Sequence, residues 1–170
     1  YQKQILWNEI KSLMPIIERF NESDNGSIRR YECELYYMQA IADMVLLNYF
    51  EARAGFKRVL IDFPDSHQQE NTRYWHAMSQ IFLKEFQQAY EEFLSYETTY
   101  SSGNWLPSAI FNSGVAQFGL EEYELATEIF TRVIDTFPDD IVYSDALGLR
   151  GDLYASDGAL EEAETDYLEA

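Results

Sequence analysis

Small and aromatic side chains recur along this chain at a fixed interval of 37 residues, from Arg29 onward. Alanine marks one row of the pattern, and an aromatic residue follows four places later in every copy. The rows are Ala52, Ala89, Ala126 and Ala163; Phe56, Phe93, Phe130 and Tyr167; Ala40, Ala77, Gly114 and Gly151; and Tyr49, Phe86, Tyr123 and Leu160. Rows that keep both spacing and residue type indicate an internal repeat.

The copy between Gly114 and Pro138 shows what one repeat contains. Its sequence, GVAQFGLEEYELATEIFTRVIDTFP, has apolar residues at helical spacing on both sides of a polar break at 120–122. It predicts the second half of one amphipathic helix, a tight turn, and a second helix that Pro138 stops. In an earlier copy, Ser66 and Gln69 have the spacing of a capping box at a helix start.

The spacings of Gly114, Tyr123, Ala126, Phe130 and Pro138 resemble those of the tetratricopeptide repeat. The resemblance covers roughly residues 30–170 and implies an all-α, right-handed α-solenoid of antiparallel helix pairs. The interval of 37 residues exceeds the family's usual length of about 34. The longer unit, with the turn FPDS at 63–66, is similar to the repeats of bacterial outer-membrane assembly lipoproteins and periplasmic scaffolds.

This resemblance implies a protein–protein scaffold with no chemistry of its own. In the family, the first helices of the pairs line a concave surface that accepts a peptide or helix of a partner. The closer resemblance implies a bacterial envelope complex, in the periplasm or on the periplasmic face of the outer membrane, and leaves the cytoplasm open. A self-assembling structural module that stacks end to end is the alternative function.

The pattern divides the chain into two regions. Residues 4–20 have the apolar spacing of an amphipathic helix, so residues 1–27 are expected to form a leading helix and a polar loop. We interpret them as a degenerate half-repeat, with a free segment that docks elsewhere as the alternative. Residues 28–170 are expected to form a tetratricopeptide-like array of about four helix pairs. The last pair is incomplete in this pattern, so a further helix or self-association should cover its apolar side.

The first helix of each pair departs from the family pattern. Polar side chains occupy places where the family has large apolar ones: Gln39, Asp43, His76, Gln80, Ser113 and Gln117. Burying such groups without partners costs roughly 1–3 kcal/mol each. We therefore favour a first helix rotated by about 100°, with a core stripe through Tyr37, Ile41 and Met44 and their equivalents. In the alternative, normal register, this stripe lines an apolar groove.

Composition and charge narrow the choice of partner. Thirty acidic residues against twelve basic ones give a formal net charge of −18. Such a charge argues against nucleic acid or an anionic membrane surface and leaves a basic protein segment as a candidate. No run of the sequence approaches the roughly 18 apolar residues that a membrane span needs.

The sequence has few residues that could act in catalysis or bind a metal. Cys33 is the single cysteine, and the only histidines, His67 and His76, have no cysteine pair near them. We find no phosphate-binding loop, nucleophile elbow or HExxH motif in the sequence. We therefore expect no disulfide, metal site, cofactor, catalytic residue or enzymatic activity.

Recognition of another protein is the remaining function, and the register decides which residues carry it. In the rotated register, the side chains nearest the concave surface are Met38, Val45, Trp75, Phe82 and Asn112. We favour Trp75 as the anchor, because tryptophan is enriched among the residues that dominate binding energy. In the normal register, the row Tyr37, Tyr74 and Phe111 takes their place.

Overall fold

The computed structural model describes Ser12, Pro15 and residues 29–170. The predicted leading helix and loop of residues 1–27 therefore lie, but for those two residues, outside the described part. The described part is helical, and its residues include no strand. The all-α prediction is confirmed for this part of the chain.

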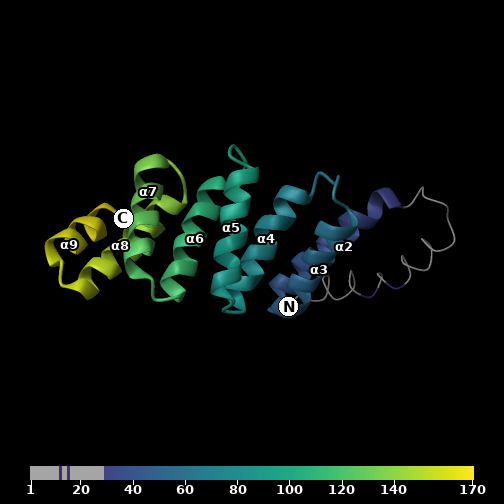
Figure 1. The fold of residues 1–170 in the computed structure, drawn as a ribbon, viewed down its shortest axis with the longest axis horizontal. Coiled ribbons are helices and arrows are strands. Elements are labelled where there is room, and N and C mark those ends of the chain that lie inside the picture. Colours follow the sequence, from purple (N-terminus) through teal and green to yellow (C-terminus); the bar gives the residue numbers. More distant parts are fainter. Residues whose placement is uncertain (1–11, 13–14, 16–28) are drawn as a thin grey trace. The chain divides into compact units, whose positions relative to one another are not determined.

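The chain forms two compact units, residues 1–83 and residues 84–170, called here the first unit and the second unit. The first unit contains α2 (Arg29–Val45), α3 (Tyr49–Asp62) and α4 (Gln69–Phe82), and α3 packs against both α2 and α4 (Figure 1). One core cluster holds Cys33, Tyr36 and Val59, and a second is built on Ala40, Met44, Ala52 and Phe56. Both clusters are formed by facing sides of α2 and α3, as the apolar spacing predicts.

The second unit contains α5 (Phe86–Thr99), α6 (Leu106–Gly119), α7 (Tyr123–Thr136), α8 (Val142–Asp157) and α9 (Leu160–Glu169). Each helix again packs against the one that follows it (Figure 1). The core cluster joins α6, α7 and α8 through Ile110, Ala126, Phe130, Val133 and Ala146. The turn predicted at 120–122 connects α6 to α7, and α7 ends just before Pro138, so both predictions are confirmed.

The recurring small and aromatic residues pack against each other. A Cβ atom added at Gly114 would lie 2.7 Å from the Phe130 ring, and one added at Gly151 would lie 2.8 Å from the Tyr167 ring. These distances are shorter than van der Waals contact, so the absence of a Cβ at these two glycines lets the first helix approach the second this closely. This contact explains why the two rows keep their spacing and residue type.

The turns between paired helices share a left-handed residue at the same interval. Positive φ angles occur at Leu47 (63°), Lys84 (59°), Glu121 (63°) and Gly158 (84°), which lie 37 residues apart. In one of these turns, the Glu122 N–H donates to the Gln117 carbonyl at 3.0 Å, a bond that closes the end of α6 in the manner of a Schellman motif. The backbone of the turn is therefore repeated even where its residue type is not.

The favoured, rotated register is wrong about the polar side chains. Asp43, His76, Gln80, Ser113 and Gln117 are all buried, and Gln39 is half-buried. The desolvation argument fails where a polar group finds a local partner. The Ser113 hydroxyl donates to the Ile110 carbonyl at 2.7 Å, and the Asp43 carboxylate accepts from the Asn48 amide at 3.2 Å.

The predicted capping box at Ser66 and Gln69 does not form. The Gln69 side-chain amide donates instead to the Phe63 carbonyl at 2.8 Å, at the C-terminal end of the preceding helix α3. The Ser66 hydroxyl accepts the Gln68 N–H at 3.1 Å and hydrogen-bonds with the Cys33 thiol at 2.9 Å. The two residues thus connect α3, α2 and the start of α4 rather than capping one helix.

Candidate functional site

An apolar surface lies on the first helices of the pairs in the first unit. We call it the first-helix face and define it by six side chains of α2 and α4: Met38, Ile41, Val45, Trp75, Met78 and Phe82. Ile41, Trp75 and Met78 are partly buried against one core cluster, which shows that the two helices contribute to the same patch. Four of the five residues predicted to bind a partner belong to this face.

The solvent-exposed part of the first-helix face consists of one pair of residues on each helix, spaced seven apart. Met38 and Val45 occupy such positions on α2, and Trp75 and Phe82 occupy them on α4, so each pair points to one side of its helix. Val45 is 52% exposed and Phe82 is 47% exposed. The face therefore offers apolar area to solvent in addition to what it contributes to the core.

The aromatic rings on this face are held by neighbouring rings. Phe82 stacks on Tyr49 of α3, with ring centroids 4.6 Å apart and an angle of 9° between the planes. Trp75 is half-buried and meets Tyr74 edge-on at 5.4 Å. Rings held in this way lose little conformational freedom when a partner binds them.

The alternative row of Tyr37, Tyr74 and Phe111 packs on the core more than it lines a groove. Tyr37 contacts Phe56 at 6.1 Å and Phe111 contacts Phe130 at 5.6 Å between ring centroids, and both are half-buried. Tyr74 is buried. Burial and the nearby Glu34 charge raise the pKa of the Tyr37 phenol, as expected for a ring that faces the protein.

Asn112, the fifth predicted residue, lies on α6 in the second unit. Its side-chain amide donates to the Ser108 carbonyl one turn earlier at 2.7 Å, and the residue is half-buried. The other four predicted residues therefore share the first unit, whereas Asn112 belongs to the second.

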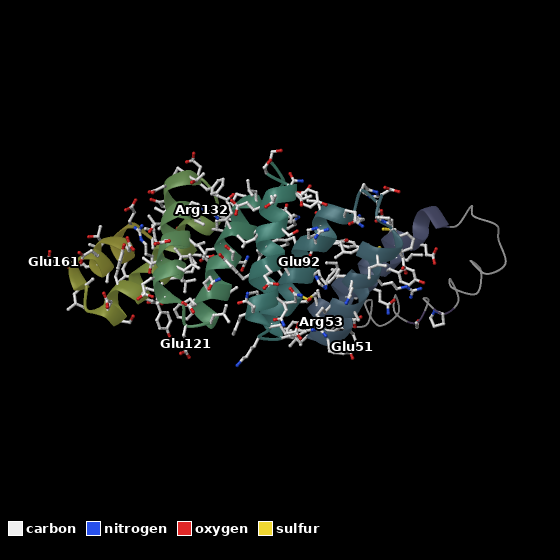
Figure 2. All side chains as sticks on the ribbon, in the orientation of Figure 1. Glu51, Arg53, Glu92, Glu121, Arg132 and Glu161 are labelled. Atoms are coloured by element: carbon white, nitrogen blue, oxygen red, sulfur yellow. The ribbon has the colours of Figure 1, made fainter. Side chains whose placement is uncertain are left out.

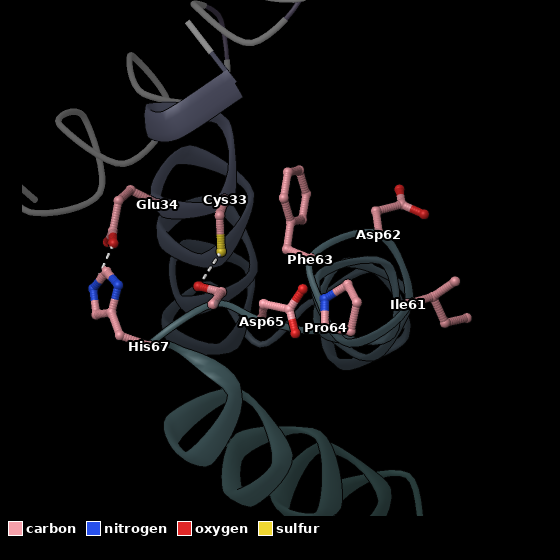
Figure 3. Close-up of a pocket in the computed structure, with 9 residues that line it drawn as sticks. Cys33, Glu34, Ile61, Asp62, Phe63, Pro64, Asp65 and His67 are labelled. Atoms are coloured by element: carbon pink, nitrogen blue, oxygen red, sulfur yellow. Dashed lines mark hydrogen bonds and ion pairs between the residues drawn. The ribbon is translucent and has the colours of Figure 1, made fainter. Parts of the chain in front are cut away.

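A second feature, which the sequence did not indicate, is a cavity of about 680 Å³ at the α3–α4 connection. Figure 3 shows Cys33 and Glu34 of α2 facing Phe63, Pro64 and His67. His67 Nε2 lies 2.8 Å from a Glu34 carboxylate oxygen. The cavity could not be predicted because its walls are separated by about one repeat in the sequence.

The one thiol that lines this cavity, that of Cys33, is not activated. Burial is the main cause of a raised pKa for the Cys33 thiol, and the Glu34 charge adds to it, although the hydrogen bond from Ser66 acts in the opposite direction. A thiol with a raised pKa forms little of the reactive thiolate. Within residues 29–170, no group of three or more His, Cys, Asp and Glu side chains could hold a metal ion. None of the described helices has the length and apolar character needed to cross a membrane.

Comparison with known proteins identifies the repeat. Residues 108–140, which span α6, α7 and the start of the next connection, match the family model of the tetratricopeptide repeat. The chain has a tetratricopeptide-like repeat fold. A search of curated proteins gives no match to it.

Solved structures with the same fold span nearly the whole chain. MamA from Desulfovibrio magneticus RS-1, residues 41 to the end, is 17% identical with a TM-score of 0.70, covering 99% of this chain and 93% of its own. YrrB, described as a TPR protein with an unusual peptide-binding site, is 16% identical with a TM-score of 0.67, covering 98% and 80%. A putative kinesin light chain from Podospora anserina is 12% identical with a TM-score of 0.71, covering 97% and 89%. These likenesses show that the tetratricopeptide-like fold extends beyond the one matched repeat.

Proposed function

We propose that the chain is a protein-interaction scaffold whose first-helix face binds a segment of a partner protein. One observation carries the proposal: α2 and α4 expose apolar area above a core that is already filled. Ala40, Ala52 and Phe56 beneath the face are buried, while Val45 and Phe82 remain about half exposed. Contiguous exposed apolar patches on soluble proteins commonly mark interaction sites.

Within this face, Trp75 is the proposed anchor and Met38, Val45 and Phe82 surround it. Trp75 presents a large ring that is half-buried and already oriented by Tyr74, so a partner gains contact area at low entropic cost. Asn112, on α6 of the second unit, is not part of this face. The peptide-binding site named in the description of YrrB supports a peptide or helix as the form of the partner.

Site-specific photo-crosslinking tests the face. A photoreactive phenylalanine analogue is placed at Val45 or Phe82 of the first-helix face and, as matched controls, at Phe50 or Ile61, which are exposed apolar residues of α3. In cells that make the protein naturally, we expect a discrete adduct from the first two positions and much less from the controls. Adducts from α3 alone, or equal adducts from all four, would contradict the proposal.

We further propose that the partner belongs to a bacterial envelope complex. The similarity of the 37-residue unit and its FPDS turn to periplasmic scaffolds supports this placement. Fractionation of the source cells tests it, with the periplasmic or membrane fraction expected to hold the protein. Recovery in the cytoplasmic fraction alone would leave the scaffold proposal standing and remove the envelope.

End-to-end self-assembly is the alternative function, and one contrast favours it. Tyr167 is 47% exposed, whereas its equivalents Phe56, Phe93 and Phe130 are at most 1% exposed. A second copy seated on α9 would bury this ring together with Leu160 and Leu168. Light scattering over a dilution series separates the alternatives, because a stacking module dissociates on dilution and a scaffold keeps one mass throughout.

A further inference from the structure

A hollow of about 330 Å³ lies between the second helices α5 and α7 of the second unit. We call it the second-helix slot, and its apolar walls are Tyr90 and Leu94 of α5 and Leu125 and Ile129 of α7. Ser113 of α6 forms its floor, and its hydroxyl already donates to the Ile110 carbonyl at 2.7 Å. The slot is therefore apolar in character, with a floor whose polar group is satisfied.

The next repeat of the same unit shows what fills this position when the chain supplies it. Arg150 lies 37 residues after Ser113. Its Nε and a terminal nitrogen donate to the two Asp166 carboxylate oxygens at 2.8 and 2.7 Å. The other terminal nitrogen donates to the Thr131 hydroxyl at 3.1 Å.

These partners are equivalents of the slot walls. Thr131 corresponds to Leu94 and Asp166 corresponds to Ile129, each at the same interval of 37 residues. We call Arg150 with Thr131 and Asp166 the Arg150 layer, and it holds a long side chain between two polar partners. In the preceding repeat, the short Ser113 lies on the floor between aliphatic walls, so the position that Arg150 fills is left open.

The first unit has a hollow of about 310 Å³ at the same place in the repeat. Its lining includes Gln39, Gly55 and Arg58, which lie two intervals before Ser113, Ile129 and Arg132. The position is thus open in two repeats and filled by Arg150 in a third.

Charge indicates what could enter the slot of the second unit. Residues 84–170 contain nineteen acidic residues against three basic ones. The two terminal nitrogens of the Arg132 guanidinium at the rim donate to Glu97 at 3.0 Å, and Arg150 is paired with Asp166. Figure 2 shows Glu121 and Arg132 toward opposite ends of α7. The exposed Glu128 at the rim adds a further negative charge.

We propose that the second-helix slot takes an aliphatic side chain from a basic segment of a partner protein. The apolar walls favour the aliphatic side chain, since the Ser113 hydroxyl on the floor is already hydrogen-bonded. The acidic unit around it favours lysine or arginine on either side of that chain. This site lies on the second helices and does not depend on the first-helix face.

Fluorescence anisotropy with a defined probe tests the proposal on the full chain. The probe is a labelled amphipathic peptide of leucine and lysine, about four helical turns long. A peptide with serine in place of every leucine keeps the charge and serves as the control ligand. We expect the leucine peptide to bind about tenfold or more tightly than the serine peptide, because the slot buries one of its aliphatic side chains.

The chain itself offers a variant that closes the slot. Leu94→Thr, Ser113→Arg and Ile129→Asp together copy the residues of the Arg150 layer and leave the net charge unchanged. We expect this triple variant to lose about tenfold of the affinity for the leucine peptide. The matched control, Ile141→Asp with Ser144→Arg, makes the same charge changes at exposed positions of the α8 start and should bind as the unmodified chain does.

Circular dichroism first establishes that the triple variant is folded. If it is not, Leu94→Ser alone serves, since Leu94 is 39% exposed and a smaller side chain at the rim should still weaken binding several-fold. Unchanged affinity in the folded slot variant would overturn the proposal. Equal binding of the leucine and serine peptides would also overturn it, because charge alone would then explain the association.

Discussion

In the first unit, residues 1–83 carry eleven acidic and nine basic side chains, whereas residues 84–170 carry nineteen and three. Ala52 and Phe56 of the first unit and Ala126 and Phe130 of the second are nevertheless all fully buried. The two units therefore share the buried residues that join the helices of a pair, but they differ in the charge of the surrounding surface. In a repeat protein, such differences allow successive units to present different surfaces.

The faces of the first helices differ in the same way. On α2 and α4 they present Ile41, Trp75 and Met78. On α8 of the second unit, the equivalents of Ile41 and Tyr37 are Asp152 and Gly148. Asp152 accepts a hydrogen bond from the Tyr167 hydroxyl at 2.7 Å, and a Cβ added at Gly148 would meet nothing within 4 Å. The apolar face is thus a feature of particular helices and not of the fold.

The largest effect on stability is expected in the buried aromatic row, which both units share. Phe130→Ala should lower the free energy of unfolding by about 3–5 kcal/mol, because it empties a fully buried site. Tyr167→Ala changes the equivalent residue at a position that is 47% exposed, so its effect should be much smaller. Denaturant unfolding followed by circular dichroism measures both. Equal losses would show that burial does not distinguish these positions.

The second prediction compares the two arginines of the second unit. Asp166→Ala removes a buried carboxylate and leaves the half-buried Arg150 without that partner, which should cost about 2–3 kcal/mol. Glu97→Ala leaves Arg132 in solvent, where an ion pair is worth less than about 1 kcal/mol. Thermal unfolding of the two variants checks this difference. Similar melting temperatures would mean that solvent or a neighbouring group replaces Asp166.

Much of the framework could be predicted from the sequence, since the packing of one helix pair is encoded within a single interval. The rows of Ala126, Phe130 and Gly114 predicted the pairs, the turn and the stop at Pro138. The register could not be settled, because the cost of burying Ser113 depends on a local bond to the Ile110 carbonyl that spacing does not reveal. The division into two units also gave no signal, since the interval runs through it unchanged.

The candidate site was predicted less completely. Met38, Val45, Trp75 and Phe82 were predicted, with Asn112, from the rotated register, and the structure places these four in one unit. The Arg150–Asp166 pair and the second-helix slot were missed because they join three helices, and neighbouring residues in the sequence do not record such contacts. Repetition could have revealed the slot, by comparison of Ser113 with Arg150.

The third prediction concerns the turns, where the repeated backbone is occupied by different residues. Gly158→Ala forces a side chain into a left-handed conformation and should cost about 1 kcal/mol. Glu121→Gly relieves the same strain and should stabilise the chain by roughly half as much, since glycine also loses more entropy on folding. Denaturant midpoints test both signs. A loss of stability in Glu121→Gly would mean that the Glu121 side chain contributes more than its backbone costs.

The smallest expected effect is on the pH dependence of stability. It distinguishes the cause of a raised tyrosine pKa in the first unit from the cause in the second. Burial, followed by the Glu34 charge, raises the pKa of Tyr37 in the first unit. In the second unit, a hydrogen bond to Asp152 is the main cause of the raised pKa of Tyr167. A folded-state pKa above the unfolded value means that each phenol stabilises the fold fully below its ordinary pKa of about 10. This contribution is lost as the pH rises through the folded-state pKa.

Tyr37→Phe and Asp152→Asn should therefore each flatten the alkaline loss of stability, for different reasons. The first variant removes the ionising group itself. The second removes the carboxylate that holds the Tyr167 proton and leaves Tyr37 unchanged. Unfolding measured at neutral pH and above the ordinary phenol pKa provides the readout, with ultraviolet absorbance reporting phenolate formation. If Asp152→Asn leaves the absorbance titration unchanged, the hydrogen bond from Tyr167 does not hold its proton. An unchanged slope in Tyr37→Phe would mean that burial of that ring does not resist ionisation.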